Sequence, residues 1–129
     1  MIFKGVKIKV SCATWEQIEV LGDFWSLMSS NVEMEKLVGL GFNWHNDSFE
    51  YAIGLIDRYD ELDRIIHSNA GEYIEIELPD RGWRTQKGKT EAIQKIYEDE
   101  FDCYNTRFKY ELEKFDKHGN CEISVNVEK

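Results

Sequence analysis

Glu113 is the strongest candidate for ligand chemistry in this sequence. It lies in the run 110–116, Tyr-Glu-Leu-Glu-Lys-Phe-Asp, whose alternation is typical of a β-strand. Side chains two apart in a strand share a face, so Glu111, Glu113 and Phe115 point one way and Leu112 points the other. An inward Glu113 would be desolvated, which raises its pKa or requires a cation, and a lipophilic cation would satisfy it. If Leu112 points inward instead, both glutamates are ordinary solvated charges.

Aromatic side chains that could line a cavity around this carboxylate are spread along the chain. A ring presents a negative face, so a cage of rings with one carboxylate binds organic cations through cation–π and Coulomb attraction together. Each ring taken singly is better explained by core packing, and only convergence near a buried carboxylate would make a site. The candidates are Phe24, Trp25, Trp44, Phe49, Tyr51 and Trp83.

Catalytic and metal-binding patterns are weak. The sequence has no GxSxG, no glycine-rich phosphate loop, no CxxC and no HExxH motif. Glu77 and Glu113 could act as paired carboxylates, but 25 acidic residues make some such pair inevitable. We therefore expect no metal and no cofactor, and reduced thiols at the widely spaced cysteines. The scattered cysteines and histidines are Cys12, Cys103, Cys121, His45, His67 and His118.

The charge balance restricts the partners. Sixteen Lys and Arg against 25 Asp and Glu give a formal net charge of −9, which repels a phosphate backbone and disfavours direct nucleic-acid binding. A cationic ligand or a basic partner suits this field, and solubility alone also explains it. No apolar run is long enough to cross a bilayer, and residues 1–7 lack the apolar stretch of a secretion signal. We expect a cytoplasmic protein that does not bind membranes.

The hydropathy pattern predicts a single α+β domain over residues 1–129. Alternation predicts strands, and apolar residues spaced three and four apart predict helices, the first behind a Thr14–Gln17 capping box and the second, of similar length, capped by Thr90. The expected order is strand 3–10, helix 15–29, connector 31–41, hairpin strands 42–45 and 49–56, loop 58–71 with at most a short helix, strands 73–78 and 83–86, a second helix, and strands 108–115 and 121–127.

This order suggests duplicated β-α-β-β halves, with two helices packed on one curved antiparallel sheet. Two helices cannot cover a broad twisted sheet completely, so the groove between them is a natural ligand site.

Four short motifs follow one another behind the 15–27 stretch and together span nearly the whole chain. They are Phe-Glu-Tyr-Ala-Ile-Gly at 49–54, Leu-Pro with Trp83 four residues on, Leu-Glu-Lys-Phe-Asp at 112–116, and Cys-Glu-Ile-Ser-Val-Asn-Val at 121–127. In this order they resemble the GyrI-like or AraC-type effector-binding domain family, whose signatures run roughly F-x-Y-x-x-G, I-P-x-x-x-[YW], F-E-x-Y-D and E-I-x-[IV]-P-[IV].

The resemblance implies a groove that holds small, often cationic and aromatic molecules. The glutamate that meets the positive charge in several drug-sensing members falls on Glu113, and the aromatic positions fall on Trp83 and Tyr51. Some members are effector domains of transcription regulators, some stand alone, and some hydrolyse reactive electrophiles. Two departures imply a different pocket rim: Asn126 replaces a proline, and residues 102–105 replace a W-L-P segment.

We therefore expect a stand-alone domain that binds a small organic, cationic and amphiphilic ligand. The two helices are committed to the sheet, so any DNA-binding regulatory partner would be a separate chain. Two alternatives stay open: a hydrolase in which Glu113 or Glu77 activates water, and an acidic module that binds a basic protein. Binding is favoured over catalysis. The expected ligand-binding residues are Glu113, Trp83, Tyr51, Phe115, Trp25 and Trp44.

Overall fold

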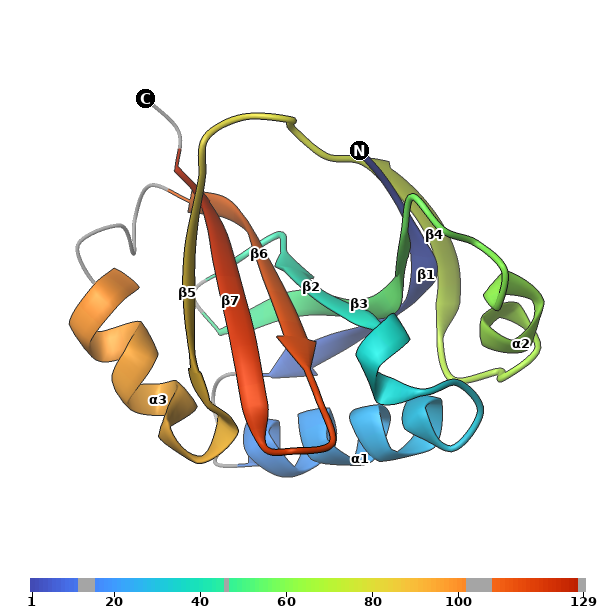
Figure 1. The fold of residues 1–129 in the computed structure, drawn as a ribbon. Coiled ribbons are helices and arrows are strands. Elements are labelled where there is room, and N and C mark those ends of the chain that lie inside the picture. The colour runs from blue at the N-terminus through green and yellow to red at the C-terminus, as the bar shows by residue number, and fades with distance from the viewer. Residues whose placement is uncertain (12–15, 46, 102–107, 128–129) are drawn as a thin grey trace.

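Antiparallel strands form one curved seven-stranded sheet in the computed structural model, which describes residues 1–11, 16–45, 47–101 and 108–127 (Figure 1). The sheet order is β4-β1-β3-β2-β6-β7-β5. This architecture confirms the predicted α+β class. The strands are β1 (Ile2–Ser11), β2 (Val38–Phe42), β3 (Ser48–Ile56), β4 (Glu72–Glu77), β5 (Trp83–Lys89), β6 (Phe108–Phe115) and β7 (Asn120–Val127).

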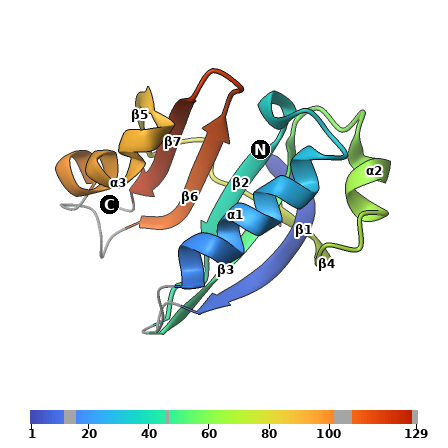
Figure 2. The same cartoon turned by 90° about the horizontal axis from the view of Figure 1, so that it is seen from below.

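The helical segments are unequal. In Figure 2, α1 (Glu16–Ser29) crosses in front of the first half of the sheet, and α3 (Ile93–Ile96) lies beside β5 and β7. A 3₁₀ turn at Thr90–Ala92 leads into α3, and a π-helical segment at Tyr97–Phe101 follows it. A short α2 (Leu62–Ile66) and a 3₁₀ turn at Met34–Lys36 complete the described helices.

The sheet is built from two similar halves. The order β1-β3-β2 of the first half is repeated in reverse as β6-β7-β5, so each half contributes its second strand to the centre. There β2 and β6 pair antiparallel around Leu40 and Leu112. The extra strand β4 extends one edge by pairing with β1.

Apolar clusters fill both faces of the sheet. On the helix-covered face, Phe24 and Met28 of α1 pack on Val10 and Ile53, and Ile96 after β5 packs on Ile123 of β7. On the opposite face, Phe3, Leu40 and Leu112 belong to a separate buried cluster. Because both faces are packed, every residue of the central strand β2 is buried.

Three of the predicted elements are wrong. Residues 39–41 were expected in a connector, but they form the centre of β2, and the expected strand 42–45 ends at Phe42. Glycines normally weaken a strand. Gly39 and Gly41 fit this strand because aromatic side chains occupy the space where their own side chains would lie. The second helix is broken into short pieces, and the buried Thr90 hydroxyl makes no capping bond to the described residues. The capping box at 14–17 begins outside the described residues.

None of the helices among the described residues is long and apolar enough to cross a bilayer.

Candidate functional site

Glu113 lies on the helix-covered face, at the seam between the two halves. In the sheet it pairs with Gly39 of β2 and Ile123 of β7, and only 8% of it is exposed. The Tyr51 hydroxyl donates to its Oε1 at 2.7 Å, and the Tyr97 hydroxyl donates toward its Oε2 at 2.8 Å. Of the two orientations that alternation left open, the structure has the inward one.

A hydrogen-bonded relay connects this carboxylate to α1. Trp25 Nε1 donates to Tyr51 Oη at 2.9 Å, and Tyr51 in turn donates to Glu113. Tyr51 is 2% exposed, and burial together with the Glu113 charge holds its pKa well above the usual value. The Trp25 ring also meets Phe115 edge-on, with centroids 5.0 Å apart. Four of the six predicted site residues therefore come together: Glu113, Tyr51, Trp25 and Phe115.

Two glycines of β2 make the space for these rings. A Cβ atom on Gly39 would lie 2.1 Å from Tyr51 Oη and 2.8 Å from the Trp25 ring. A Cβ atom on Gly41 would lie 3.0 Å from the Trp44 ring. Real Cβ contacts do not approach to such distances as 2.1 Å, so a side chain at position 39 would push the rings away from the carboxylate.

Glu111 is a second buried carboxylate on the same face. Like Glu113 it is 8% exposed, and the Tyr97 hydroxyl contacts its Oε1 as well as Glu113 Oε2. Burial and then the neighbouring Glu113 charge raise the pKa of Glu111 to about 8. Burial also raises the pKa of Glu113, opposed by the two tyrosine hydroxyls. Neither glutamate forms an ion pair with a described basic residue.

Trp44 lies at the edge of this cluster. Its ring stacks on Phe49 at a centroid distance of 4.5 Å and an interplanar angle of 21°. It covers Gly41, which pairs with Glu111. With 41% of the residue exposed, Trp44 contributes a rim to the Glu111 side rather than a wall to Glu113.

Trp83 does not join the cluster. It packs with Leu40 and Leu112 on the opposite face, and its Nε1 donates to the Pro79 carbonyl at 2.8 Å. Sequence spacing could not reveal this, because the side of the sheet depends on the register of β5 against β7. The sheet therefore separates Trp83 from Glu113, and their expected convergence is wrong. The side-chain amide Nδ2 of Asn126, which pairs with Trp83, donates to the Arg81 carbonyl at 2.8 Å, and proline has no such side-chain donor.

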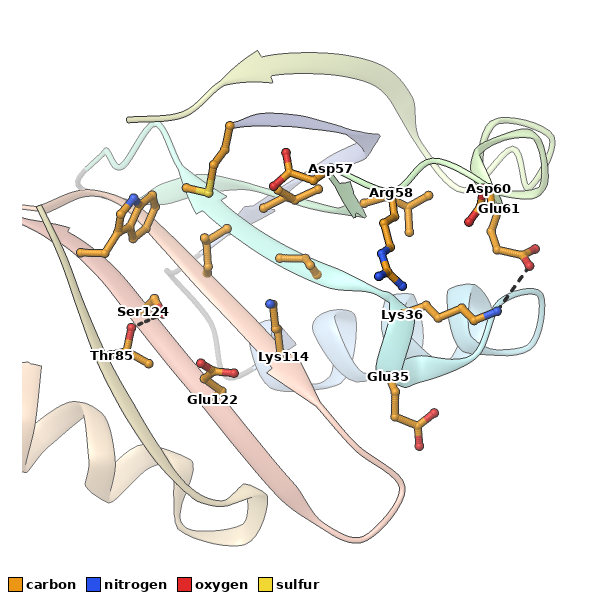
Figure 3. Close-up of a pocket in the computed structure, with 16 residues that line it drawn as sticks. Glu35, Lys36, Asp57, Arg58, Asp60, Glu61, Thr85, Lys114, Glu122 and Ser124 are labelled. Carbon is orange, nitrogen blue, oxygen red and sulfur yellow. Dashed lines mark hydrogen bonds and ion pairs between the residues drawn. The ribbon is translucent and has the colours of Figure 1, made fainter. Parts of the chain in front are cut away.

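Trp83 instead lines a cavity of about 630 Å³ on that opposite face (Figure 3). Figure 3 shows Arg58 and Lys114 directed toward its interior. The Thr85 and Ser124 hydroxyls are hydrogen-bonded to each other in its wall at 2.7 Å. Both acidic and basic side chains line this cavity, so its lining selects no single charge of ligand.

The possible pair of catalytic carboxylates, Glu77 and Glu113, is not brought together by the fold. Glu77 is on the edge strand β4, and β1, β3 and β2 lie between it and the strand of Glu113, so these two carboxylates do not form a pair. Within the described ranges, no three His, Cys, Asp or Glu side chains are placed to hold a metal ion.

Sequence reasoning missed Tyr97 and did not select Glu111. Tyr97 falls in the second predicted helix, and the periodicity of that helix does not reveal the π-helical segment that begins there. For Glu111 a signal existed, because it stands two residues before Glu113 and must share its face. The role of Gly39 and Gly41 depends on their pairing with a strand that is distant in sequence, so the local pattern around them predicts only a connector.

Two solved structures share this fold over nearly the whole chain. The structure of SAV2435 bound to tetraphenylphosphonium has a TM-score of 0.65 and 14% identity, covering 99% of this chain and 88% of that one. A proposed bacterial transcription regulation protein from Staphylococcus aureus MU50 has a TM-score of 0.59 and 12% identity, covering 100% of this chain and 93% of that one. No protein-family model and no curated protein matches the chain.

Proposed function

We propose that residues 1–129 form a small-molecule-binding domain whose ligand is a lipophilic organic cation held at Glu113. One observation carries the proposal: a carboxylate buried among aromatic rings receives hydroxyl donors but no cationic partner from the described residues. Burying an uncompensated charge is costly, and a ligand that brings positive charge and apolar surface relieves that cost.

The aromatic neighbours suit such a ligand. Trp25 and Phe115 are half-buried and meet edge to face beside the carboxylate, so they can present ring surface to an incoming cation. Tyr51 is fixed by its bonds to Trp25 and Glu113, which keeps the carboxylate oriented before the ligand arrives. A preoriented charge costs less to use in binding than a mobile one.

The similar fold of SAV2435, which was solved with tetraphenylphosphonium, supports this ligand class and supplies the probe. Likeness to a proposed transcription regulation protein supports an effector-sensing role. The GyrI-like resemblance of the motifs points the same way.

Titration with tetraphenylphosphonium tests the proposal. Binding should quench Trp25 fluorescence, and Glu113→Gln should weaken affinity about 10- to 100-fold, the range for losing one charge-assisted contact. The neutral triphenylphosphine oxide should bind the parent protein more weakly than the cation does. The Glu113→Gln variant should bind the neutral compound and the cation with equal affinity. Equal affinity of parent and Glu113→Gln for the cation would refute the role of this carboxylate.

Two variants control for the position of the charge and of the ring. Glu122→Gln removes a carboxylate that lines the opposite cavity, and Trp83→Phe removes the indole from that face. Both should bind tetraphenylphosphonium as the parent does, whereas Tyr51→Ala should bind it less tightly. A loss of affinity in Trp83→Phe that matches Tyr51→Ala would move the site to the opposite face.

A further inference from the structure

The hydrogen bonds around Glu113 require one more proton than the tyrosines supply. The Tyr97 hydroxyl contacts both Glu111 Oε1 and Glu113 Oε2. A phenol has one hydrogen and ionised carboxylates only accept, so Tyr97 can make one full hydrogen bond to this pair, or share its hydrogen weakly between them. The second contact becomes a full hydrogen bond when that carboxyl carries a proton and donates it to the Tyr97 oxygen.

The remaining contacts indicate which carboxyl holds the proton. Tyr51 uses its hydrogen toward Glu113 Oε1, because Trp25 Nε1 already donates to the Tyr51 oxygen. Glu113 can therefore accept from two hydroxyls, whereas Glu111 has only the Tyr97 contact among the described residues. The arrangement that satisfies every contact runs from protonated Glu111 to Tyr97 and on to ionised Glu113.

The surroundings of the pair provide no alternative charge balance in the described part of the chain. β2 presents Gly39 and Gly41, α1 presents Trp25, and β3 presents Tyr51. The remaining titratable neighbours are Tyr97 after α3 and Cys121 of β7, whose pKa is raised by burial and by the Glu113 charge. None of these side chains is cationic, and two adjacent buried negative charges repel each other strongly.

We infer that a proton on Glu111 and an organic cation compete for this site, so that ligand uptake expels the proton into solvent. The inference rests on the proposed function and adds a second specificity-determining residue to it. The site carries a charge of −1 when empty, from Glu113 alone. After the exchange both glutamates are ionised, and the ligand charge returns the total to −1.

Linkage fixes the sign of the pH effect. A nearby cation favours the ionised form of a carboxyl, and by reciprocity the ionised form favours the cation. Affinity for a permanent cation should therefore rise with pH across the range in which Glu111 loses its proton, by up to about tenfold per pH unit. The pKa of about 8 places this range near neutral and mildly alkaline pH.

Isothermal titration calorimetry with tetraphenylphosphonium, which has no titratable group, measures the exchange directly. Parent protein is titrated at one near-neutral pH in phosphate and in Tris, whose ionisation enthalpies differ widely. The difference in observed enthalpy should correspond to release of a fraction of one proton per ligand. Identical enthalpies in the two buffers would overturn the inference while leaving the proposed function intact, and absence of binding would overturn the proposed function.

Glu111→Gln identifies the source of the proton. This variant keeps Glu113 and should still bind the cation, with no proton released and with an affinity that no longer changes with pH. Glu122→Gln, the matched change on the opposite face, should release the same fraction as the parent. Undiminished proton release by Glu111→Gln would contradict the assignment, and the two-buffer measurement on the parent decides the exchange even if this variant fails to fold.

Discussion

The two halves of the sheet meet at strands that share a backbone and differ in chemistry. Leu40 of β2 and Leu112 of β6 pair at the centre, and a two-fold rotation about them would place Gly39 on Glu111 and Gly41 on Glu113. The first half thus has no side chain at the two positions where the second half has carboxylates. The site exists because one half supplies charge and the other supplies room for the rings around it.

The helices of the two halves differ in the same sense. In the first half, α1 is regular for 14 residues and seals its side of the sheet with Phe24 and Met28. In the second half, α3 has four residues and passes into a π-helical segment that begins at Tyr97. Single-turn π segments recur at functional sites. Here the irregular segment provides the hydroxyl that contacts both glutamates, whereas the regular helix α1 provides apolar packing and the indole of Trp25.

The largest expected effect comes from giving the first half a side chain at the seam. Gly39→Ala puts a methyl group 2.1 Å from Tyr51 Oη, so the Trp25, Tyr51 and Glu113 contacts must shift. We expect a loss of about 2–4 kcal/mol in the free energy of unfolding, measured by urea denaturation.

Gly22→Ala is the matched control, because Gly22 is inside α1 with nothing within 4 Å of an added Cβ. It should stabilise the protein by about 0.5–1 kcal/mol. If both changes shift stability in the same direction, close packing above Gly39 is not what separates it from Gly22.

A smaller effect is expected from removing a hydroxyl from the seam. Tyr51→Phe deprives Glu113 of a donor and Trp25 Nε1 of an acceptor in a buried setting. The cost should be about 1–3 kcal/mol by urea denaturation. Tyr73→Phe removes an exposed Tyr–Glu hydrogen bond on β4, formed with Glu75 at 2.8 Å, and should cost less than about 0.5 kcal/mol. Similar losses for the two variants would mean that the buried Tyr51 hydroxyl stabilises the fold no more than the exposed Tyr73 hydroxyl does.

The next effect is a pH dependence of stability that comes from Glu111 in the second half of the sheet. The pKa of Glu111 is raised from 4.5 to about 8, so its protonated form stabilises the fold at low pH. This contribution is fully present below about pH 4.5 and is lost as pH rises through about 8. Thermal denaturation from pH 5 to 9 should therefore show the parent losing stability relative to Glu111→Gln as pH rises. A constant difference across this range would contradict a protonated Glu111.

The smallest effect is expected at the second glycine of the seam. Gly41→Ala places a methyl group 3.0 Å from the Trp44 ring, which is partly exposed and can move outward. We expect a loss of less than about 1 kcal/mol, with a shift in Trp44 fluorescence toward longer wavelength. A loss as large as that of Gly39→Ala would show that Trp44 is held as firmly as Tyr51.

Local sequence patterns predicted most elements of the fold. The alternation at 108–115 placed β6 and put Glu111, Glu113 and Phe115 on one face, because the strand period of two is a property of the backbone. Helix α1 and the strands β1 and β3 were predicted for the same kind of reason, whereas β2 was not. The inward orientation of that face was left open, since it depends on which residues pack against it.

Only the tertiary structure decided the site. Pairing of β2 with β6 brought glycines 39 and 41 opposite the glutamates, and the register of β5 on β7 turned Trp83 to the opposite face. These are contacts between segments more than 30 residues apart, and their energies depend on packing and burial that no local period encodes. The chain therefore determined by itself which side chains could share a strand face, while folding determined which carboxylates lost their water and which rings replaced it.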